Sequence, residues 1–287
     1  MKRFLSLMLS IVVTSTVWAT NTPLTFDVYN AHESSFHVNA TVVSGATEAA
    51  IIDTGFTQAD ALRIAAKLKD SGKKLTTIFI SQADPDFYFG ASTLATIFPD
   101  VAIVTSAPVA KKIRKNIDQK VAFWGPKMGL NAPEQPNVPQ VLAKSHFSID
   151  GIRINVLGAK GKLSHRPYLW IEETKTILGT IGVFGNLHVW TADTQTDEAI
   201  DAWIKQLDDM MALQPQKVIP GHMQADTQLS PSSIDFTKHY LLAFKQEKSK
   251  AANSNELQQR MKTLYPDLGL LIALDIGSKV HTGEMAW

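Results

Sequence analysis

The sequence predicts an α/β fold, and three observations indicate it. β-Rich apolar runs alternate with helical patterns through the first half of the chain. Two hairpin signals, Asp150-Gly151 and Glu172-Glu173-Thr174, then open the second half. A helical pattern over residues 197–213 and a short apolar run over residues 217–219 follow them. Strands that alternate with helices in this way are typical of α/β proteins.

The first half is expected to begin with two strands that lead into a helix. Thr57 and Asp60 have the spacing of a capping box at the start of this helix, and Gly72 ends it. A polar loop follows the next strand, and a short helix begins after Gly90. The expected strands cover residues 36–43, 49–52, 76–81 and 101–105, and a further helix begins at about residue 107.

The second half is expected to contain two hairpins and three helices. The helix over residues 197–213 carries apolar side chains at helical spacing, which predicts that one of its faces is buried. Pro266 stops the last of the three helices. The expected strands cover residues 147–149, 152–157, 168–171, 176–178 and 217–219, and the two C-terminal helices cover 232–248 and 255–264.

Residues 1–19 are interpreted as an export signal. Lys2 and Arg3 precede an apolar run, and Val17 and Ala19 occupy the two places that signal peptidase reads, so cleavage is expected after Ala19. A membrane anchor is the alternative, but the run falls short of the roughly 20 apolar residues that a span needs and contains several hydroxyl residues. We therefore expect a periplasmic or secreted protein with no stable membrane anchor after cleavage.

Charge and cysteine content exclude several kinds of function. Removal of residues 1–19 takes two cations from the 28 Lys and Arg, which leaves 26 against 27 Asp and Glu. This balance predicts no nucleic-acid partner. The chain has no cysteine, which excludes disulfides, a thiolate metal site and a cysteine nucleophile.

Residues 20–287 are interpreted as one domain. Their length would also allow two small domains, but α/β layers often run longer than the usual domain size. The only linker-like stretch is Pro126–Pro139, which carries four prolines between the two halves.

The segment Gln82–Gly90, which reads Q-A-D-P-D-F-Y-F-G, is the most informative for function. It resembles the H-x-H-x-D-H signature of the metallo-β-lactamase superfamily, which a glycine closely follows. In that register Gln82, Asp84 and Phe87 stand in the histidine places, and Asp86 matches the aspartate. The loop therefore resembles a dinuclear metal-binding loop in which most ligands are replaced.

Three further segments line up with the same superfamily in the expected order: residues 51–55 (I-I-D-T-G), 178–188 and 218–222 (V-I-P-G-H). The resemblance implies an αβ/βα four-layer sandwich, with two central sheets, helices outside, and a site at one edge where loops from both halves meet. In that family the Asp of the first segment supports the site, which places Asp53 there. The histidine that ends the last segment is a metal ligand, and His222 matches it. His165 is the only histidine near the place of another ligand, and Ile181 occupies the place of the bridging aspartate.

These residues leave two interpretations of the metal chemistry open. A two-zinc centre needs more imidazole and carboxylate ligands than the chain keeps, so dinuclear β-lactamase activity is not expected. Asp84, Asp86 and His222, with the carbonyl of Gln82, would suit one divalent metal of the harder kind, such as Mn, Mg or Ca. Alternatively, Asp84-Pro85-Asp86 is a turn whose carboxylates accept backbone hydrogen bonds, and no cofactor is bound.

Other side chains are candidates for a pocket at the same edge. His188 and Asp193 would line it together, although a histidine among apolar neighbours is more often a core residue. Tyr88 belongs to a set of aromatic residues that are either core or the wall of an apolar pocket for a small organic ligand. This set comprises Phe87, Tyr88, Phe89, Phe123, Trp124, Trp170 and Trp190.

Two functions therefore remain as hypotheses. The first is a hydrolase of an ester, lactone, amide or phosphoester, in which Asp84, Asp86 and His222 hold one metal or perform acid–base catalysis directly. The second is a non-catalytic protein that binds a small molecule and has lost the metal site. Both predict a small-molecule partner.

Overall fold

The computed structural model describes residues 23–133 and 135–287. The predicted export signal, residues 1–19, lies outside this range. Within it, none of the helices has both the length and the apolar character needed to cross a bilayer.

The first half of the chain builds a six-stranded sheet whose strands follow sequence order. The β1, β2 and β3 strands pair antiparallel, and β3 through β6 pair parallel. The strands are β1 (Thr25–Asn30), β2 (Asn39–Ser44), β3 (Glu48–Ile52), β4 (Lys74–Ile80), β5 (Ile103–Thr105) and β6 (Gln140–Val141).

The second half builds a five-stranded sheet in the order β12-β10-β9-β8-β7 and a short parallel pair, β11 with β13. Both predicted hairpins are present, since β7 pairs with β8 and β9 pairs with β10 in antiparallel register. The strands are β7 (His146–Ile149), β8 (Ile152–Leu157), β9 (Tyr168–Ile171), β10 (Thr176–Leu178), β11 (Phe184–Gly185), β12 (Lys217–Val218) and β13 (His222–Met223).

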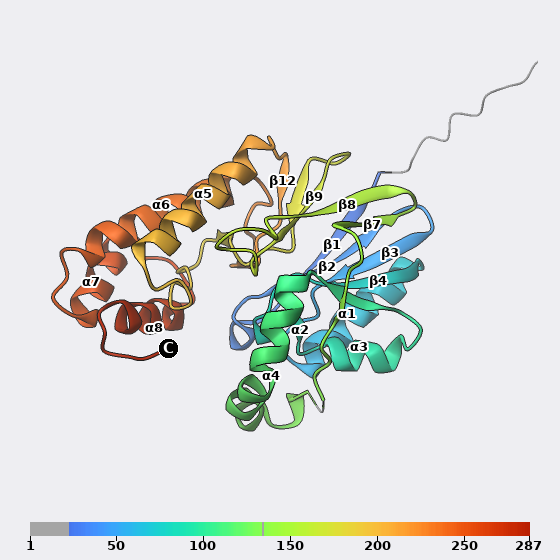
Figure 1. The fold of residues 1–287 in the computed structure, drawn as a ribbon, viewed down its shortest axis with the longest axis horizontal. Helices are drawn as coiled ribbons and strands as arrows, with labels where there is room; N and C mark the ends of the chain where they lie inside the picture. Colours follow the sequence, from blue (N-terminus) through green and yellow to red (C-terminus); the bar gives the residue numbers. More distant parts are fainter. Residues whose placement is uncertain (1–22, 134) are drawn as a thin grey trace, which may run out of the picture.

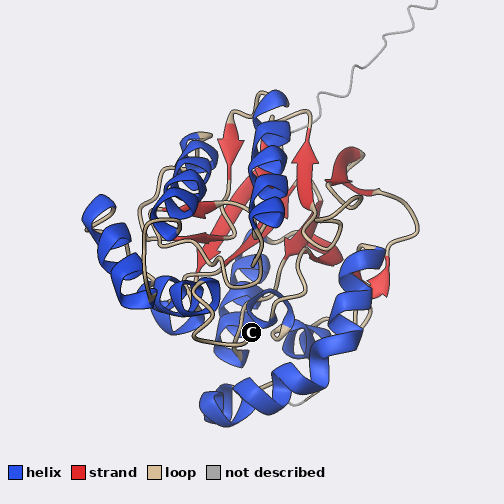
Figure 2. Cartoon of the chain, turned by 60° about the vertical axis from the view of Figure 1, so that its left-hand side comes forward, coloured by secondary structure: helices blue, strands red, loops and turns tan. Residues whose placement is uncertain are grey.

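Helices cover the outer face of each sheet, as Figures 1 and 2 show. The first sheet carries α1 (Gln58–Ser71), α2 (Pro85–Tyr88), α3 (Ala91–Ile97) and α4 (Ala107–Met128). The second carries α5 (Asp197–Ala212), α6 (Ser232–Lys248), α7 (Ser254–Leu264) and α8 (Leu271–His281).

Three apolar cores separate the layers. One joins the first sheet to its helices, for example Ile78 to Ile64, and another joins the second sheet to α5 and α6, for example Ile177 to Trp203. The third lies between the two sheets. Helix, sheet, sheet and helix therefore stack as the predicted αβ/βα four-layer sandwich, because each sheet buries apolar side chains on both faces.

The predicted strand over residues 36–43 begins later than expected. A 3-10 turn, η1 (Glu33–Ser35), precedes it, and both Phe36 and His37 have left-handed backbone angles, with φ of 57° and 54°. A strand cannot include such residues, so β2 starts at Asn39. The turn directs the Phe36 side chain away from the sheet and toward the site described below.

The helix over residues 58–71 has the predicted capping box, in which Thr57 and Asp60 satisfy each other's backbone N–H groups. Other elements differ from the sequence prediction. The expected polar loop contains α2, helix α4 continues past Pro126 into the expected linker, and β1 and α8 were not predicted. Their short or mixed apolar patterns carry little periodic signal.

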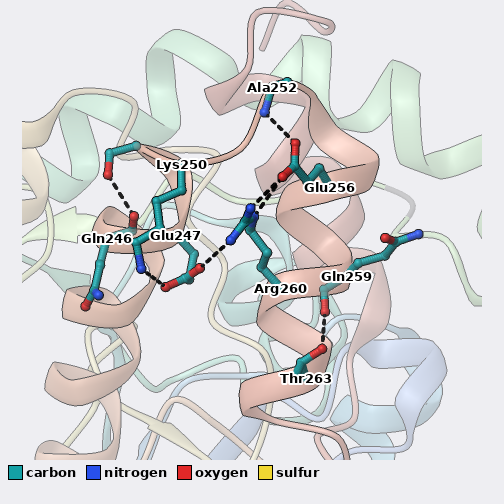
Figure 3. A network of polar contacts seen from close by, with 9 residues as sticks. Gln246, Glu247, Lys250, Ala252, Glu256, Gln259, Arg260 and Thr263 are labelled. Carbon is teal, nitrogen blue, oxygen red and sulfur yellow. Dashed lines mark hydrogen bonds and ion pairs between the residues drawn. The ribbon is translucent and has the colours of Figure 1, made fainter.

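The C-terminal helices are joined by a polar network (Figure 3). Arg260 on α7 contacts Glu256 one turn away at 2.6 Å and Glu247 on α6 at 3.4 Å. Glu256 also accepts a hydrogen bond from the backbone N–H of Ala252, which precedes α7. The network connects α6 to α7 at the surface, and its residues lie outside the lining of the cleft described below.

Gly90 allows two backbone segments of the first half to approach closely. A Cβ atom at this position would lie 2.0 Å from the carbonyl oxygen of Thr54, in the turn that follows β3. Gly125, in the interior of α4, has open space instead, with nothing within 4 Å of a Cβ atom.

We expect Gly90→Ala to lower the free energy of unfolding by about 2–4 kcal/mol, because neither backbone segment can move without disturbing the sheet. The matched control Gly125→Ala should change it by less than about 1 kcal/mol, because the gain in helix propensity opposes the contact of the new Cβ with the ring of Pro126, which follows it in α4. Urea denaturation of both variants measures these changes. Equal effects would show that the Thr54 turn is not packed as described.

Candidate functional site

A cleft opens where loops from both halves meet, and it contains about 520 Å³ of atom-free space, part of it open to solvent. Its lining combines aromatic rings with a small number of charged groups. The lining residues are Phe36, Phe56, Asp84, Pro85, Asp86, Lys120, Trp124, Ile181, Phe184, Trp190, Asp193, His222, Leu270 and Trp287. The last residue of the sequence belongs to this set, and Figure 1 places that end of the chain between α8 and α4.

The loop after β4 places two carboxylates in the cleft. Asp84 is the N-cap residue of α2, and Pro85 at the first helical position fixes the backbone angle that starts the turn. Asp86 lies in the first turn and is 8% exposed. Burial raises the pKa of both carboxyl groups, and the charge of Asp84 raises that of Asp86 further.

His222 stands beside Asp86 and is oriented by a backbone carbonyl. Its Nδ1 lies 2.9 Å from the carbonyl oxygen of Phe36, which only accepts, so Nδ1 carries the proton. Its Nε2 lies 3.4 Å from Oδ2 of Asp86. Burial lowers the pKa of His222 to about 4, so the ring is neutral at pH 7 and the contact is not an ion pair.

Asp193 has the opposite electrostatic character. Burial favours its neutral form, but the charge of Arg166 and a hydrogen bond from the indole N–H of Trp287, at 2.9 Å, together lower its pKa. Asp193 is therefore ionised at neutral pH and holds the Trp287 ring in place. The same bond places Trp287 over one side of the cleft.

Two predicted residues lie behind the cleft rather than in it. Asp53 is 2% exposed and accepts hydrogen bonds from the backbone N–H and the hydroxyl of Ser81, both at 2.7 Å. It has a left-handed backbone angle, φ 63°, that aims its carboxylate at the loop after β4. Gln82 is fully buried, and its amide group donates to the carbonyl of Pro167 at 2.8 Å. Both residues fix the base of the loop.

The remaining predicted residues separate into two groups. Tyr88, the last residue of α2, is completely buried in the first core, and His188 is buried in the second core, where its Nδ1 lies 3.0 Å from the Tyr240 hydroxyl. His165 does not line the cleft, and burial lowers its pKa to about 4. Among the predicted aromatic residues, Trp124 and Trp190 line the cleft, whereas Phe87, Phe89 and Trp170 are core and Phe123 is half exposed.

Several lining residues were missed from the sequence. Phe36 follows η1, Phe56 follows the turn after β3, and Lys120 lies on α4, so no shared local motif connects them. Trp287 is separated from Asp193 by 94 residues, and only the fold brings them together. The sequence carries no local signal that groups these residues.

The family profile of the metallo-β-lactamase superfamily matches residues 35–222. The chain belongs to the metallo-β-lactamase superfamily. No curated protein matches it.

Solved structures share the superfamily fold at low sequence identity. A metallo-β-lactamase family protein from Thermus thermophilus superposes with a TM-score of 0.62 at 14% identity, covering 90% of this chain and 91% of that one. A β-lactamase domain protein from Burkholderia ambifaria gives 0.63 at 12% identity, covering 90% and 84%. A metallo-β-lactamase from Pontibacter korlensis gives 0.53 at 17% identity, covering 76% and 93%.

The residues of the site do not fit the dinuclear metal centre that the superfamily implies. Phe87 and Ile181, at two of the ligand places, pack together in a small apolar cluster. The amide nitrogen of Gln82 donates to the backbone carbonyl of Pro167, whereas its Oε1 is buried without a partner among the described residues. Within residues 23–133 and 135–287 no group of three or more His, Cys, Asp or Glu side chains is placed to hold a metal ion. Asp86 and His222 adjoin each other without a third ligand.

We expect Asp53 to make stability depend on pH. Burial raises its pKa to about 7, above the ordinary value near 3.9 of an unfolded chain. The folded state therefore holds a proton that the unfolded state releases between about pH 4 and 7. Stability falls as pH rises through this window, by up to about 1.4 kcal/mol per pH unit.

The Asn side chain of Asp53→Asn does not titrate, so this variant lacks the loss of stability described above. The difference in free energy of unfolding, variant minus wild type, should therefore become more positive as pH rises from about 4 to 7. Urea denaturation at several pH values measures the difference. Asp150→Asn is the control, and its pH dependence should have the opposite sign. Hydrogen bonds from Thr47 lower the pKa of the Asp150 carboxylate, so the ionised carboxylate stabilises the fold at higher pH and its replacement removes that stabilisation. A constant difference for Asp53→Asn would contradict the burial described above.

Proposed function

We propose that this protein binds a small organic molecule in the cleft and does not use the dinuclear metal chemistry of its superfamily. The observation that carries the proposal is the composition of the cleft, where aromatic rings surround the positions at which the superfamily holds metal. Phe184 stacks on the ring of His222 with centroids 5.1 Å apart, and Phe87 meets the same ring edge-on at 5.4 Å. The imidazole is thus packed as an aromatic wall of the cleft.

The composition of the cleft supports this function. Ligand sites for small molecules combine apolar walls with few polar groups. Six lining residues are aromatic, and the charged residues among the lining are Asp84, Asp86, Lys120 and Asp193. A small ligand would contact the aromatic rings and gain orientation from the carboxyl groups.

We further propose that the protein acts after export, in a periplasm or outside the cell. The support is the sequence of residues 1–19, with two cations before an apolar run and Ala19 at the cleavage position. The absence of cysteine suits either place, since no thiol is exposed to oxidation.

A hydrolase of an ester, lactone, amide or phosphoester is the second candidate function, and one observation favours it. His222 keeps its Nδ1 proton on the Phe36 carbonyl, so its unprotonated Nε2 is free to accept a proton next to Asp86. A neutral imidazole beside a carboxyl group of raised pKa has the parts of a general base and a general acid. In this version Asp84 modulates the pKa of Asp86.

Binding is tested with N-phenyl-1-naphthylamine, a neutral dye that fluoresces in apolar sites. We expect the wild type to bind it, and Trp124→Ala to weaken binding at least about tenfold, because Trp124 is a partly buried aromatic wall of the cleft and its loss should cost more than about 1.4 kcal/mol. Phe123→Ala is the control, since Phe123 is the neighbouring residue of α4, is half exposed, and lies outside the cleft lining. Equal affinity of the wild type and Trp124→Ala would contradict the proposal.

Turnover distinguishes the second candidate. Hydrolysis of p-nitrophenyl acetate in the presence of a chelator, abolished in both Asp86→Asn and His222→Gln, would favour the metal-free hydrolase. Background hydrolysis that is equal in the wild type and both variants, with dye binding intact, would favour the binding protein.

A further inference from the structure

The aromatic walls of the cleft form one continuous series of rings. Trp287 packs against Trp190 with centroids 5.7 Å apart, and Trp190 meets Phe36 at 6.1 Å. Phe36 in turn contacts Phe56 at 5.3 Å and Trp124 at 5.4 Å. Most of these pairs are tilted or edge-on, so the rings present faces as well as edges to the cleft.

Three carboxylates face these rings. Asp84, Asp86 and Asp193 all line the cleft. Asp86 is 8% exposed, and its side chain makes no hydrogen bond to any other residue in the described part of the chain. Its Oδ2 lies 3.4 Å from Nε2 of His222. A buried carboxyl group that lacks a donor from another residue and is open to a cleft is a place for a donor that comes from a ligand.

Three basic residues act on these carboxyl groups: Lys120 on all three, and Lys112 and Arg166 on Asp84 and Asp193. Among the described residues, Lys120 is the one lysine or arginine in the cleft lining, and its ammonium group lies over the Trp287 ring, 5.7 Å from the centroid. The charge of Arg166 lowers the pKa of Asp84 and of Asp193, although Arg166 does not line the cleft. Its side chain is 3% exposed, and its guanidinium carbon lies 4.8 Å from the centroid of the Trp203 ring. Lys112 acts on the same two carboxylates and also lies outside the lining.

We propose that the ligand of this cleft is a small organic cation, an amine or a quaternary ammonium compound, held between the aromatic series and the carboxylates of Asp84, Asp86 and Asp193. The inference rests on the proposed binding function and names the chemical class that the site selects. Aromatic faces attract cations through their quadrupoles, and the position of Lys120 over Trp287 is an internal example of this contact. The ionised Asp193 supplies the opposite charge, next to the Trp287 ring to which it is hydrogen-bonded.

The inference is tested with two probes of the same shape, phenyltrimethylammonium and tert-butylbenzene. The central atom of the substituent is a positively charged nitrogen in the first probe and a neutral carbon in the second. Their affinities are measured by displacement of N-phenyl-1-naphthylamine. We expect the cation to bind at least about tenfold more tightly. The neutral probe is the more hydrophobic of the two, so a preference for the cation requires electrostatic recognition.

Asp193→Asn separates charge from shape. Asparagine keeps an oxygen that accepts the Trp287 N–H, so the ring stays in place while the charge is lost. We expect this variant to bind phenyltrimethylammonium about three- to tenfold more weakly and tert-butylbenzene unchanged. Asp209→Asn is the control, because Asp209 is an exposed residue of α5 outside the cleft lining, and it should leave both affinities unchanged.

Equal affinities for the two probes, or no binding of the cation while the dye still binds, would overturn the inference and leave the binding function standing. A dye affinity that does not respond to Trp124→Ala would overturn the binding function itself. The two failures are therefore distinguishable in the same set of titrations.

Discussion

The junction between Pro220-Gly221-His222 and residues 36–39 is the constraint on which the site depends. Asn39 donates to the carbonyl of Gly221 from its backbone and to that of Pro220 from its side chain, both at 2.8 Å. A Cβ atom on Gly221 would lie 2.1 Å from the carbonyl oxygen of Thr180, so only glycine allows this approach. The same junction brings Nδ1 of His222 to the Phe36 carbonyl. Two segments far apart in the sequence thus hold the imidazole and one aromatic wall in fixed relation.

This junction explains how a superfamily fold can keep its site while the chemistry of the site changes. His222 retains the backbone contact that orients a metal-binding histidine, but its neighbours are Phe87 and Phe184 instead of further ligands. The carboxylates of Asp84 and Asp86 remain near it, in a cleft that burial makes less polar. Aromatic packing and unpaired carboxyl groups favour recognition of an organic molecule over coordination of an ion.

The sequence predicted the layers better than the site. Capping at Thr57, the hairpin at Asp150-Gly151 and the apolar stripe of α5 are local patterns, and each gave the correct element. The resemblance of four motifs to a known superfamily then supplied the four-layer sandwich. Boundaries failed where a residue left the regular backbone, as at Phe36.

The cleft was predictable only in part, because its members share no local pattern. Asp84, Asp86 and His222 were found from motif positions, and Asp193 and Trp190 from their place near an expected pocket. Trp287 and Lys120 enter the site through contacts across the fold, such as the Asp193 hydrogen bond. Conversely, His188 and Tyr88 have the residue types of a site, but their surroundings are core.

Zinc binding tests the central claim, that this cleft takes the place of a metal centre, most directly. The protein is dialysed to equilibrium against about 10 µM zinc, and bound metal is measured by elemental mass spectrometry, with His222→Ala alongside. The account predicts the same bound zinc in both proteins, below about a tenth of an equivalent, because three ligands are not brought together. One or two equivalents in the wild type, lost in His222→Ala, would contradict it.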